Sequence, residues 1–458
     1  MKSILANNVL NINPQDYSLL TDLYQLTMSA CYVGEGIADK RASFELFMRR
    51  LPNSFGYLIA MGLAQAIEYL EQLSFSPQQI EGLQATGIFN STPAAFWQLL
   101  KSSSFIGDVW AVPEGTAIFA NEPILRIEAP LWQAQLVETY LLNTINYQTL
   151  IATKAARIRD IAGGDADIIE FGTRRAFSPQ GSMWAARAAL AAGFDGTSNV
   201  LAALKLGEKP RGTMAHALVM AISAISGDED EAFSAFQNYF PQAPLLIDTY
   251  DTVAATKRLQ SKVNAGEMRV PGVRIDSGDL VELSQKVDRL LPDTKIFVSG
   301  DLDEWEIARL KQEGAVIDGY GIGTKLVTGV SLGGVYKLVE IDRIPTMKQS
   351  SNKVSYPGCK QIFRTVVDGK IQSDRLGLAD EQPQDGEQCL LVKVMQSGKR
   401  LQPTPALSQI RQRTTNSVAS LSGNVRSIDN PQPLTVNISD ALKSLQKSIS
   451  QHNPAINN

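Results

Sequence analysis

Histidine is scarce in this chain of 458 residues, so chemistry that needs an imidazole falls on His216 and His452 alone. His216 follows a predicted turn at residues 212–213 and precedes an apolar helix. The start of a helix attracts anions, and a neutral imidazole there can accept a phosphoryl group as a covalent intermediate. A core histidine that bonds a backbone carbonyl explains the same residue, so both interpretations stay open.

Two short acidic clusters combine carboxylates with hydroxyl groups. Residues 248–251 read Asp-Thr-Tyr-Asp, and residues 276–279 read Asp-Ser-Gly-Asp. This mixture suits a ribose diol or a Mg²⁺ ion that carries phosphates. Asp and Ser also cap the N-termini of helices, and the sequence alone does not decide between the two roles.

A glycine-rich loop and several arginines supply further groups that can bind phosphate. Residues 319–325 read Gly-Tyr-Gly-Ile-Gly-Thr-Lys, which is the spacing of neither a P-loop nor a dinucleotide-binding loop. Backbone N–H groups freed by these glycines can still hold one phosphate. Arg174, Arg175 and Arg274 stand where strands are expected to end. A guanidinium group binds phosphate or carboxylate with two parallel bonds, although a surface salt bridge is the alternative for each arginine.

Five apolar runs between residues 131 and 344 position these polar clusters. Each run begins with β-branched residues, ends in a polar or glycine-rich cluster, and alternates with a helical segment, which is typical of βα units. The runs are residues 167–175, 245–251, 273–278, 296–301 and 316–323. Ligands of parallel α/β folds bind at the carboxyl ends of strands, so we expect the five clusters to meet at one site.

The remaining sequence predicts a domain on either side of this α/β segment, residues 131–344. Residues 1–130 combine amphipathic helices, such as residues 58–73, with strands near residues 108–127, which predicts a mixed α/β domain. We expect residues 345–458 to pack back on that N-terminal domain.

The C-terminal segment itself offers few signals. A strand is predicted at residues 390–395 and a final helix at residues 439–448, with a polar stretch between them. His452 then falls in a frayed tail rich in Pro and Asn.

The composition argues against several classes of protein. Lys and Arg number 43 against 47 Asp and Glu, and no long basic run occurs, so nucleic acid is not an expected partner. No secretory signal and no apolar stretch of about 18 residues is present, which indicates a cytoplasmic protein without a membrane partner. Cys31, Cys359 and Cys389 lack a metal-binding spacing and suit a reducing compartment.

Taken in order, these motifs resemble the nicotinate phosphoribosyltransferase family. The resemblance runs from about residue 17 to residue 344 and rests on residues 21–28, 170–175, 212–216, 275–279 and 322–325. It implies a type II phosphoribosyltransferase, in which an irregular TIM-like α/β barrel is joined to the N-terminal mixed domain. It also implies a head-to-tail homodimer whose active sites are shared between subunits.

The resemblance assigns roles to particular residues. Phe171 and Tyr24 of the partner subunit would stack on opposite faces of the pyridine ring. His216 would carry the phosphoryl group as a phosphohistidine, and Asp248 and Asp276 would hold the ribose or Mg²⁺. The other implied contacts to phosphate, carboxylate and ribose are Arg174, Arg274, Ser277, Gly278, Gly300, Asp301, Gly321, Gly323 and Thr324.

The implied reaction joins nicotinate to phosphoribosyl pyrophosphate and releases nicotinate mononucleotide and pyrophosphate. Its transition state has oxocarbenium character, and the attacking ring nitrogen carries no proton, so no general base is required. ATP is a co-substrate: it phosphorylates His216, and hydrolysis of the phosphohistidine to ADP and phosphate drives synthesis.

Ser198 is the clue to which base is used. Nicotinamide-specific relatives resemble this chain but carry Asp at this position, and that carboxylate would repel nicotinate, whereas a serine hydroxyl can donate to it. Ser198 is also a candidate N-cap for a helix predicted over residues 200–206.

Three alternatives remain. A nicotinamide phosphoribosyltransferase would differ mainly in its base. A sensor barrel that binds pyridine nucleotides or phosphosugars would lack the reaction. An aldolase-type barrel would need a Schiff-base lysine, for which only Lys325 and Lys295 are candidates.

Overall fold

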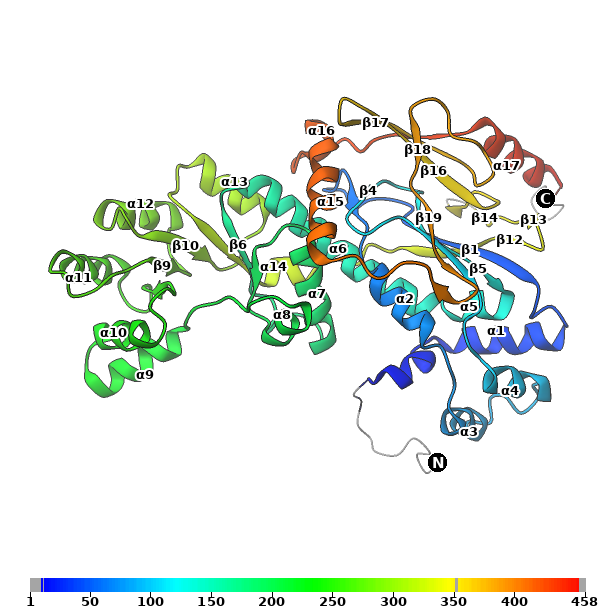
Figure 1. The fold of residues 1–458 in the computed structure, drawn as a ribbon, viewed down its shortest axis with the longest axis horizontal. Coiled ribbons are helices and arrows are strands. Elements are labelled where there is room, and N and C mark those ends of the chain that lie inside the picture. The colour runs from blue at the N-terminus through cyan, green and yellow to red at the C-terminus, as the bar shows by residue number, and fades with distance from the viewer. Residues whose placement is uncertain (1–9, 11, 351–352, 453–458) are drawn as a thin grey trace. The chain divides into compact units, whose positions relative to one another are not determined.

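A computed structural model of the chain describes residue 10, residues 12–350 and residues 353–452, and these form two compact units (Figure 1). Unit 1 combines the described residues of Met1–Leu150, Ser331–Ala406 and Asn416–Asn458. Unit 2 combines Ile151–Val330 with Leu407–Thr415. The sequence-based domain division lies at 130/131 and 344/345, whereas the units divide near 150/151 and 330/331.

Unit 2 is built on a six-stranded sheet in which every neighbouring pair of strands is parallel, in the order β7-β6-β11-β10-β9-β8. The strands are β6 (Asp167–Glu170), β7 (Gly196–Thr197), β8 (Leu245–Leu246), β9 (Gly272–Ile275), β10 (Lys295–Ser299) and β11 (Gly319–Ile322). The five predicted apolar runs supply all of them except β7, which the sequence did not reveal. This confirms the parallel α/β architecture of the segment.

The strand order of unit 2 is the chain order read around a ring, as in an α/β barrel. One pairing is missing from the ring, because β7 and β8 are not paired with each other in the described part of the chain. The expectation of a TIM-like barrel is therefore met only as a mixed α/β fold with an open parallel sheet.

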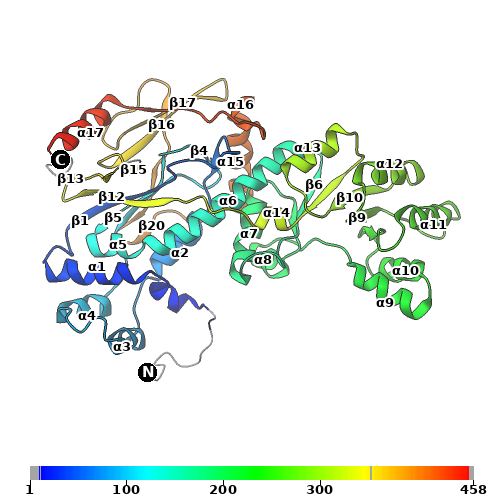
Figure 2. The same ribbon diagram turned by 180° about the vertical axis from the view of Figure 1, so that it is seen from behind.

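Helices follow the strands of unit 2, and Figure 2 shows them from the side opposite to Figure 1. They are the end of α6 (Glu138–Ala162), α7 (Pro179–Ala191), α8 (Val200–Leu206), α9 (His216–Ser226), α10 (Glu229–Tyr239), α11 (Thr252–Asn264), α12 (Leu280–Leu290), α13 (Glu304–Gln312), α14 (Thr324–Val327) and the start of α15 (Leu407–Ser420). Polar side chains start several of these helices: Asp251 caps α11 and Asp279 caps α12 by accepting backbone N–H groups. The capping interpretation of the two acidic clusters is thus correct for the second Asp of each.

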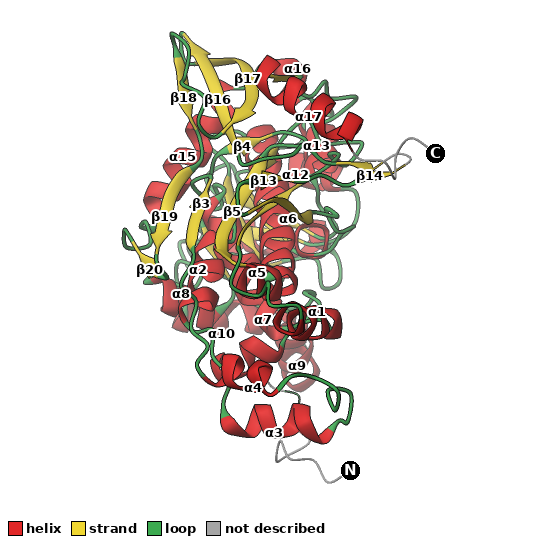
Figure 3. Ribbon diagram, turned by 90° about the vertical axis from the view of Figure 1, so that its right-hand side faces the viewer, coloured by secondary structure: helices red, strands yellow, loops and turns green. Residues whose placement is uncertain are grey.

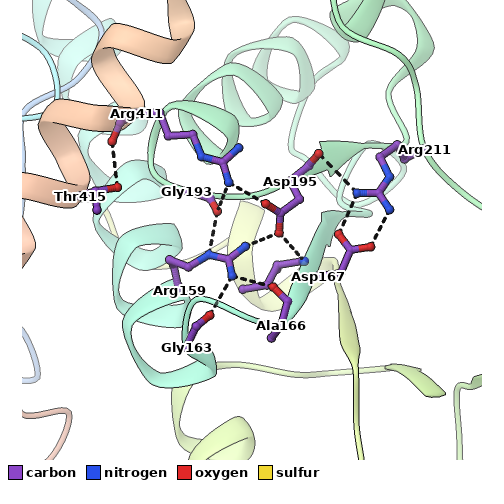
Figure 4. A network of polar contacts seen from close by, with 10 residues as sticks. Arg159, Gly163, Ala166, Asp167, Gly193, Asp195, Arg211, Arg411 and Thr415 are labelled. Carbon is purple, nitrogen blue, oxygen red and sulfur yellow. Dashed lines mark hydrogen bonds and ion pairs between the residues drawn. The ribbon is translucent and has the colours of Figure 1, made fainter. Parts of the chain in front are cut away.

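A network of ion pairs fastens the start of α15 to the amino-terminal side of this sheet (Figure 4). Asp195 receives Arg159 at one oxygen, and Arg411 of α15 approaches its other oxygen at 2.6 Å. Burial alone would raise the pKa of Asp195, but the N–H of Ile168 and the two guanidinium groups lower it below its usual range. Thr414 adds a hydrogen bond of 2.9 Å to the carbonyl of Ala191. Residues 407–415 are therefore an integral part of unit 2.

Unit 1 holds a seven-stranded sheet in the order β13-β12-β1-β5-β3-β19-β20, whose pairs are all antiparallel (Figure 3). Its strands are β1 (Arg41–Phe47), β3 (Asp108–Ala111), β5 (Pro123–Pro130), β12 (Val335–Ile341), β13 (Ile344–Pro345), β19 (Val392–Gln396) and β20 (Lys399–Arg400). A second sheet has the order β18-β16-β17-β21, with β16 (Lys360–Val367), β17 (Lys370–Leu378), β18 (Glu387–Cys389) and β21 (Val436–Ile438). Two short pairs complete the strands: β2 (Leu58–Ile59) with β4 (Ala117–Ile118), and β14 (Gln349–Ser350) with β15 (Lys353–Val354).

The helices of unit 1 are η1 (Pro14–Leu19), α1 (Leu23–Gly34), α2 (Leu63–Glu71), α3 (Pro77–Ala85), α4 (Ala94–Lys101), α5 (Leu131–Leu136), the start of α6, the end of α15, α16 (Gly423–Arg426) and α17 (Asp440–His452). Among the described residues, no helix combines the length and apolar character needed to cross a membrane.

Three details of the predicted elements in unit 1 are wrong. The helix expected over residues 58–73 begins only at Leu63, because β2 and Gly62, with a φ of +100°, precede it. The strand expected at residues 390–395 is β19, shifted by two residues at its start. The final helix extends to His452, so this histidine does not lie beyond it. The tail expected to be frayed after it lies outside the described residues.

A buried carboxyl group of unit 1, that of Glu122, lies near the ion pair of Arg364 with Asp374 in the second sheet. Glu122 is fully buried, and its Oε2 accepts the N–H of Phe119 at 2.8 Å. Arg364 donates two hydrogen bonds to Asp374 nearby. Burial, together with the charge of Asp374, raises the pKa of Glu122 well above its usual range, although Arg364 opposes this shift. A protonated Glu122 can then donate to the Asp374 carboxylate.

This raised pKa makes the stability of unit 1 depend on pH. The folded state keeps a proton on Glu122 that the unfolded chain releases, so the stabilisation is complete below the ordinary glutamate pKa and is lost as pH rises through the folded value. We expect Glu122→Gln to reduce the slope of the free energy of unfolding against pH by up to about 1.4 kcal/mol per pH unit. Urea unfolding midpoints at several pH values test this, with Glu81→Gln at an exposed position as control. An unchanged pH slope in Glu122→Gln would contradict the assignment.

Candidate functional site

Two predicted aspartates meet at the carboxyl ends of β8 and β9. Asp248 Oδ2 accepts the backbone N–H of Asp276 at 2.8 Å and the hydroxyl of Ser277 at 2.7 Å. Ser299, at the end of β10, donates its hydroxyl to Asp276 Oδ1. Adjacent parallel strands thus bring Asp248 and Asp276 into one hydrogen-bonded group, as the sequence predicted. Ser299 is a member of this group that the sequence did not reveal.

The second oxygen of Asp248 is the most informative atom of this group. Oδ1 is buried and has no hydrogen-bond partner among the described residues. A buried carboxylate oxygen without a partner is costly, so it points to a ligand hydroxyl or a cation. Carboxylate oxygens suit Mg²⁺, and the pair Asp248 and Asp276 fits such an ion if water and phosphate oxygens complete its shell. The described residues contain no cluster of three or more metal-binding side chains.

His216 begins α9 beside this group. Its Nδ1 lies 3.1 Å from the hydroxyl oxygen of Thr249, the residue that follows Asp248. The ring is half-buried, and this contact is to a hydroxyl rather than to the backbone carbonyl expected for a core histidine. A partner at one nitrogen fixes the plane of the ring and leaves the other nitrogen for a different contact. Thr249 is therefore a site residue that the sequence placed in a motif without assigning a role.

The guanidinium group of Arg274 lies over the ring of Phe171. The guanidinium carbon of Arg274 is 5.9 Å from the centre of the Phe171 ring, within the range of a cation–π contact. Gly321 makes room for the ring, because a Cβ atom there would lie 2.4 Å from Phe171. The phenyl group therefore depends on a glycine in a neighbouring strand.

The guanidinium group of Arg274 can bind an anion. Its Nε is buried and lacks a hydrogen-bond partner among the described residues. Burial lowers the pKa of Arg274, and the charges of Asp276 and Asp248 oppose this shift. The guanidinium group still keeps its proton, so an unsatisfied positive donor is held next to an aromatic face. A planar aromatic acid matches both features.

Glycines shape the ends of β9 and β10. Gly300 has a φ of +98°, and a Cβ atom there would lie 2.5 Å from the carbonyl oxygen of Asp276, so only glycine fits. Gly278 has a φ of +86°, and the exposed Asp301 also adopts a positive φ, of +47°. These residues give the loops their tight turns and leave backbone groups accessible.

The predicted phosphate loop ends at a short helix. Gly323 precedes α14, and Thr324 is its half-buried first residue. Lys154 donates to the backbone carbonyls of Lys325 and Thr328, the latter at 2.7 Å, and so anchors the other end of this helix. Burial lowers the pKa of Lys154, with Glu304 and Asp303 opposing the shift. No motif pointed to Lys154, which lies about 170 residues away along the chain.

Ser198 follows β7 and is half-buried. The helix that starts next, α8, is capped by Asn199, whose Oδ1 accepts the N–H of Ala202 at 3.0 Å. The suggestion that Ser198 caps this helix is therefore wrong. Its own N–H donates to the carbonyl of Glu170 at 2.9 Å, which holds its backbone next to the segment that carries Phe171.

Four other predicted residues are exposed or belong to unit 1. Arg174 is exposed in the loop after Phe171, and Gly278 is exposed after β9. Ser277 is also exposed, and its hydroxyl donates to Asp248. Tyr24 belongs to α1 of unit 1, with 46% of its surface exposed, so it is not among the residues that unit 2 brings together.

A cavity of about 970 Å³ in unit 2 reaches the inner side of this sheet. Phe171, Arg274 and Gly321 line it together with residues at the amino-terminal ends of the strands, such as Asp167 and Lys295. The Phe171 ring and the unsatisfied Arg274 guanidinium group therefore border open space.

The chain was compared with protein-family profiles and with known proteins. The profile of the nicotinate phosphoribosyltransferase (NAPRTase) N-terminal domain matches residues 19–146, that of the NAPRTase family matches residues 166–340, and that of the C-terminal domain matches residues 387–446. The chain is 39% identical over 468 residues to a nicotinate phosphoribosyltransferase of Bacillus subtilis, covering 92% of this chain and 93% of the relative. It is 41% identical over 425 residues to one of Mycobacterium tuberculosis, covering 90% and 89%.

The fold agrees with these matches. The crystal structure of human nicotinic acid phosphoribosyltransferase superposes with a TM-score of 0.82 at 30% identity, covering 94% of this chain and 99% of that one. A nicotinate-nucleotide pyrophosphorylase structure from Pyrococcus furiosus superposes with a TM-score of 0.73 at 25% identity, covering 90% and 98%. The three family profiles, the two relatives and the human structure lead to one conclusion: this chain belongs to the nicotinate phosphoribosyltransferase family.

Proposed function

We propose that this chain is a nicotinate phosphoribosyltransferase that works in the biosynthesis of NAD. It joins the ring nitrogen of nicotinate to C1 of phosphoribosyl pyrophosphate and releases pyrophosphate. The observation that carries the proposal is the unsatisfied Arg274 beside the Phe171 ring, because a flat aromatic carboxylate satisfies both. The buried, unpaired oxygen of Asp248 supplies the matching contact for the ribosyl donor.

The chemistry asks for positioning and electrostatics rather than for a general base. The nicotinate nitrogen attacks C1 as the bond to pyrophosphate breaks, and positive charge develops on the sugar. Phe171 stacks on the ring, and Arg274 binds an anionic group of the substrates, so the nitrogen faces the sugar. Asp248 and Asp276 hold the ribose hydroxyls or Mg²⁺, which when bound neutralises charge on the leaving pyrophosphate.

The phosphate of the donor is assigned to the loops at the ends of β9, β10 and β11. Gly300 turns the chain after β10 with a φ of +98°, Gly321 lies in β11, and Gly323 and Thr324 begin α14 after that strand. Backbone N–H groups in such loops bind phosphate oxygens. Gly278, Asp301 and Arg174 are placed around the same ligand as outer contacts.

ATP is the proposed third substrate. His216 accepts the γ-phosphoryl group, and the P–O bond to ADP breaks as the P–N bond forms. Water then cleaves the phosphohistidine to phosphate and restores the imidazole. Thr249 holds the ring plane through both steps by its contact at Nδ1.

The proposal also covers the assembly and the compartment. A homodimer shares its active sites, so Tyr24 of the partner subunit covers the face of the base opposite Phe171. We propose that the sheet of unit 2, which is open between β7 and β8 in the described part of the chain, corresponds to the irregular barrel of this enzyme class. We place the enzyme in the cytoplasm, where its free cysteines stay reduced.

The alternatives fit less well. A Schiff-base lysine needs a desolvated amine, yet Lys295 and Lys325 are both exposed, and Lys325 lies 3.6 Å from Asp303. A sensor without a reaction gives no role to His216 beside Asp248. A nicotinamide enzyme would favour a carboxylate as acceptor for the amide N–H, whereas the neutral Ser198 hydroxyl can donate to the carboxylate of nicotinate without repelling it.

A base-choice assay with a charged variant tests the central proposal. The wild type should convert nicotinate, phosphoribosyl pyrophosphate and ATP to nicotinate mononucleotide. Ser198→Asp should lower kcat/KM for nicotinate by at least about a hundredfold, because two like charges would meet in a partly buried site. Ser198→Asn, which adds similar bulk without charge, should lose much less. Product from nicotinamide alone in the wild type would overturn the choice of base.

Phosphate labelling tests the role of His216. With labelled ATP, the wild type should acquire an acid-labile, base-stable phosphate, and His216→Ala should lose both this label and ATP hydrolysis. Slow synthesis without ATP should survive, since the groups that bind the base and the sugar are intact. His452→Ala is the matched control and should keep the label. Full labelling of His216→Ala would end the assignment.

Mixed dimers test the shared site. Tyr24→Ala and Phe171→Ala should each be nearly inactive, because each removes one stacking face from every site. A heterodimer of the two variants has one of its two sites with both rings intact, so purified heterodimers should recover about half of the wild-type activity. If verified heterodimers stay as inactive as the parents, the two rings do not belong to one shared site.

A further inference from the structure

Glu170 is a buried carboxyl group in unit 2 to which the reaction assigns no role. It ends β6 and is 0% exposed, and both of its oxygens have partners. Oε1 accepts the N–H of Gly172, and Oε2 accepts the hydroxyl of Thr197. One carboxylate therefore ties the segment after β6 to Thr197, which lies 27 residues after Glu170 in the chain.

The two tied segments carry the residues proposed to contact the base. Gly172 directly follows Phe171, and Thr197 directly precedes Ser198. The N–H of Ser198 also donates to the carbonyl of Glu170, at 2.9 Å. Phe171 itself donates its N–H to the carbonyl of Ile322 at 2.7 Å, so its backbone is held from both sides.

Thr197 passes this constraint on to the start of the next helix. Its hydroxyl oxygen accepts the N–H of Asn199 at 3.0 Å while the hydroxyl proton goes to Glu170. Asn199 caps α8 and donates to the hydroxyl of Ser182 of α7 at 3.1 Å. Ser198 thus lies between two residues whose polar groups are fully engaged.

Space is as restricted as hydrogen bonding in this region. A Cβ atom on Gly172 would lie 2.2 Å from Val327 and 2.7 Å from Glu170 Oε1. No other residue fits there without displacing the carboxylate. The length of the link from Glu170 to Gly172 is therefore set by packing.

We propose that Glu170 and Thr197 act as a positioning clamp that sets the distance between the Phe171 ring and the Ser198 hydroxyl, and thereby the affinity for the base and the preference for a carboxylate over a carboxamide. Neither clamp residue is assigned contact with the substrates. The clamp rests on the proposed function, because it gives meaning to the spacing of two base contacts. Sites that recognise a small planar ligand depend on such supporting groups, since small displacements of a contact group weaken binding and selectivity.

The clamp can be opened by one substitution of nearly constant volume. Thr197→Val removes the hydroxyl that joins Glu170 to Asn199, whereas Thr197→Ser keeps it. Thr256→Val is the matched control, because Thr256 is also buried in unit 2 and its hydroxyl donates to the carbonyl of Thr252 in its own helix, at 2.6 Å. All variants are made in the full-length chain.

Steady-state kinetics with both bases measure the effect. We expect Thr197→Val to raise the KM for nicotinate about tenfold and to lower the preference for nicotinate over nicotinamide, with a change of less than about twofold in the KM for phosphoribosyl pyrophosphate. Thr197→Ser should restore both values, and Thr256→Val should change neither, even if its melting temperature falls.

A purely structural role predicts a different pattern. Thr197→Val would then lower the melting temperature and the amount of active enzyme while both KM values and the base preference stay at wild-type levels, and that result would overturn the clamp. If Thr197→Val does not fold, Thr197→Ala replaces it, because it removes the same hydroxyl from Glu170 and Asn199. A wild type that makes no mononucleotide from nicotinate would overturn the proposed function and the clamp together, whereas normal wild-type turnover with an unchanged variant KM would overturn the clamp alone.

Discussion

A buried carboxylate is stable when both of its oxygens have partners, and Asp248 meets this condition at one oxygen only. The N–H of Asp276 and the hydroxyl of Ser277 fix one side of the group, so it cannot turn its other oxygen toward water. Asp276 is fixed in turn by Ser299. The carboxyl ends of three adjacent parallel strands thus hold an acceptor in an unsatisfied state, and a ligand releases that cost when it binds.

The gap in the ring of strands has a functional counterpart. The segment between β7 and β8 carries both Ser198 and His216, the residues proposed to choose the base and to carry the phosphoryl group. This segment depends on side-chain bonds such as those of Thr249 and Thr197, just as Asp248 and Asp276 depend on bonds from Ser277 and Ser299 beyond the ends of their strands. Polar side chains do there what the backbone ladder does in the other strands.

The sequence was a good guide wherever the signal was local. Apolar runs that end in Asp or Gly located five of the six strands in unit 2 and led directly to Asp248 and Asp276. Strand β7 was not predicted, because its two residues make no pattern. The supporting role of Glu170 was not predicted either, because its hydrogen-bond partner Thr197 can be recognised only in the folded chain. The strands of residues 360–378 were missed because polar side chains such as Arg364 and Asp374 are paired inside the fold, which hides the alternation of apolar and polar residues.

The discontinuous make-up of the two units bears on how the chain folds during synthesis. β1 lies between β5 and β12, and β3 pairs on one side with β19, so the main sheet of unit 1 cannot close until about residue 396 has left the ribosome. The ion-pair network of Asp195 in unit 2 likewise forms completely only after Arg411 has been synthesised. A nascent chain therefore exposes open sheet edges of unit 1 for most of its translation.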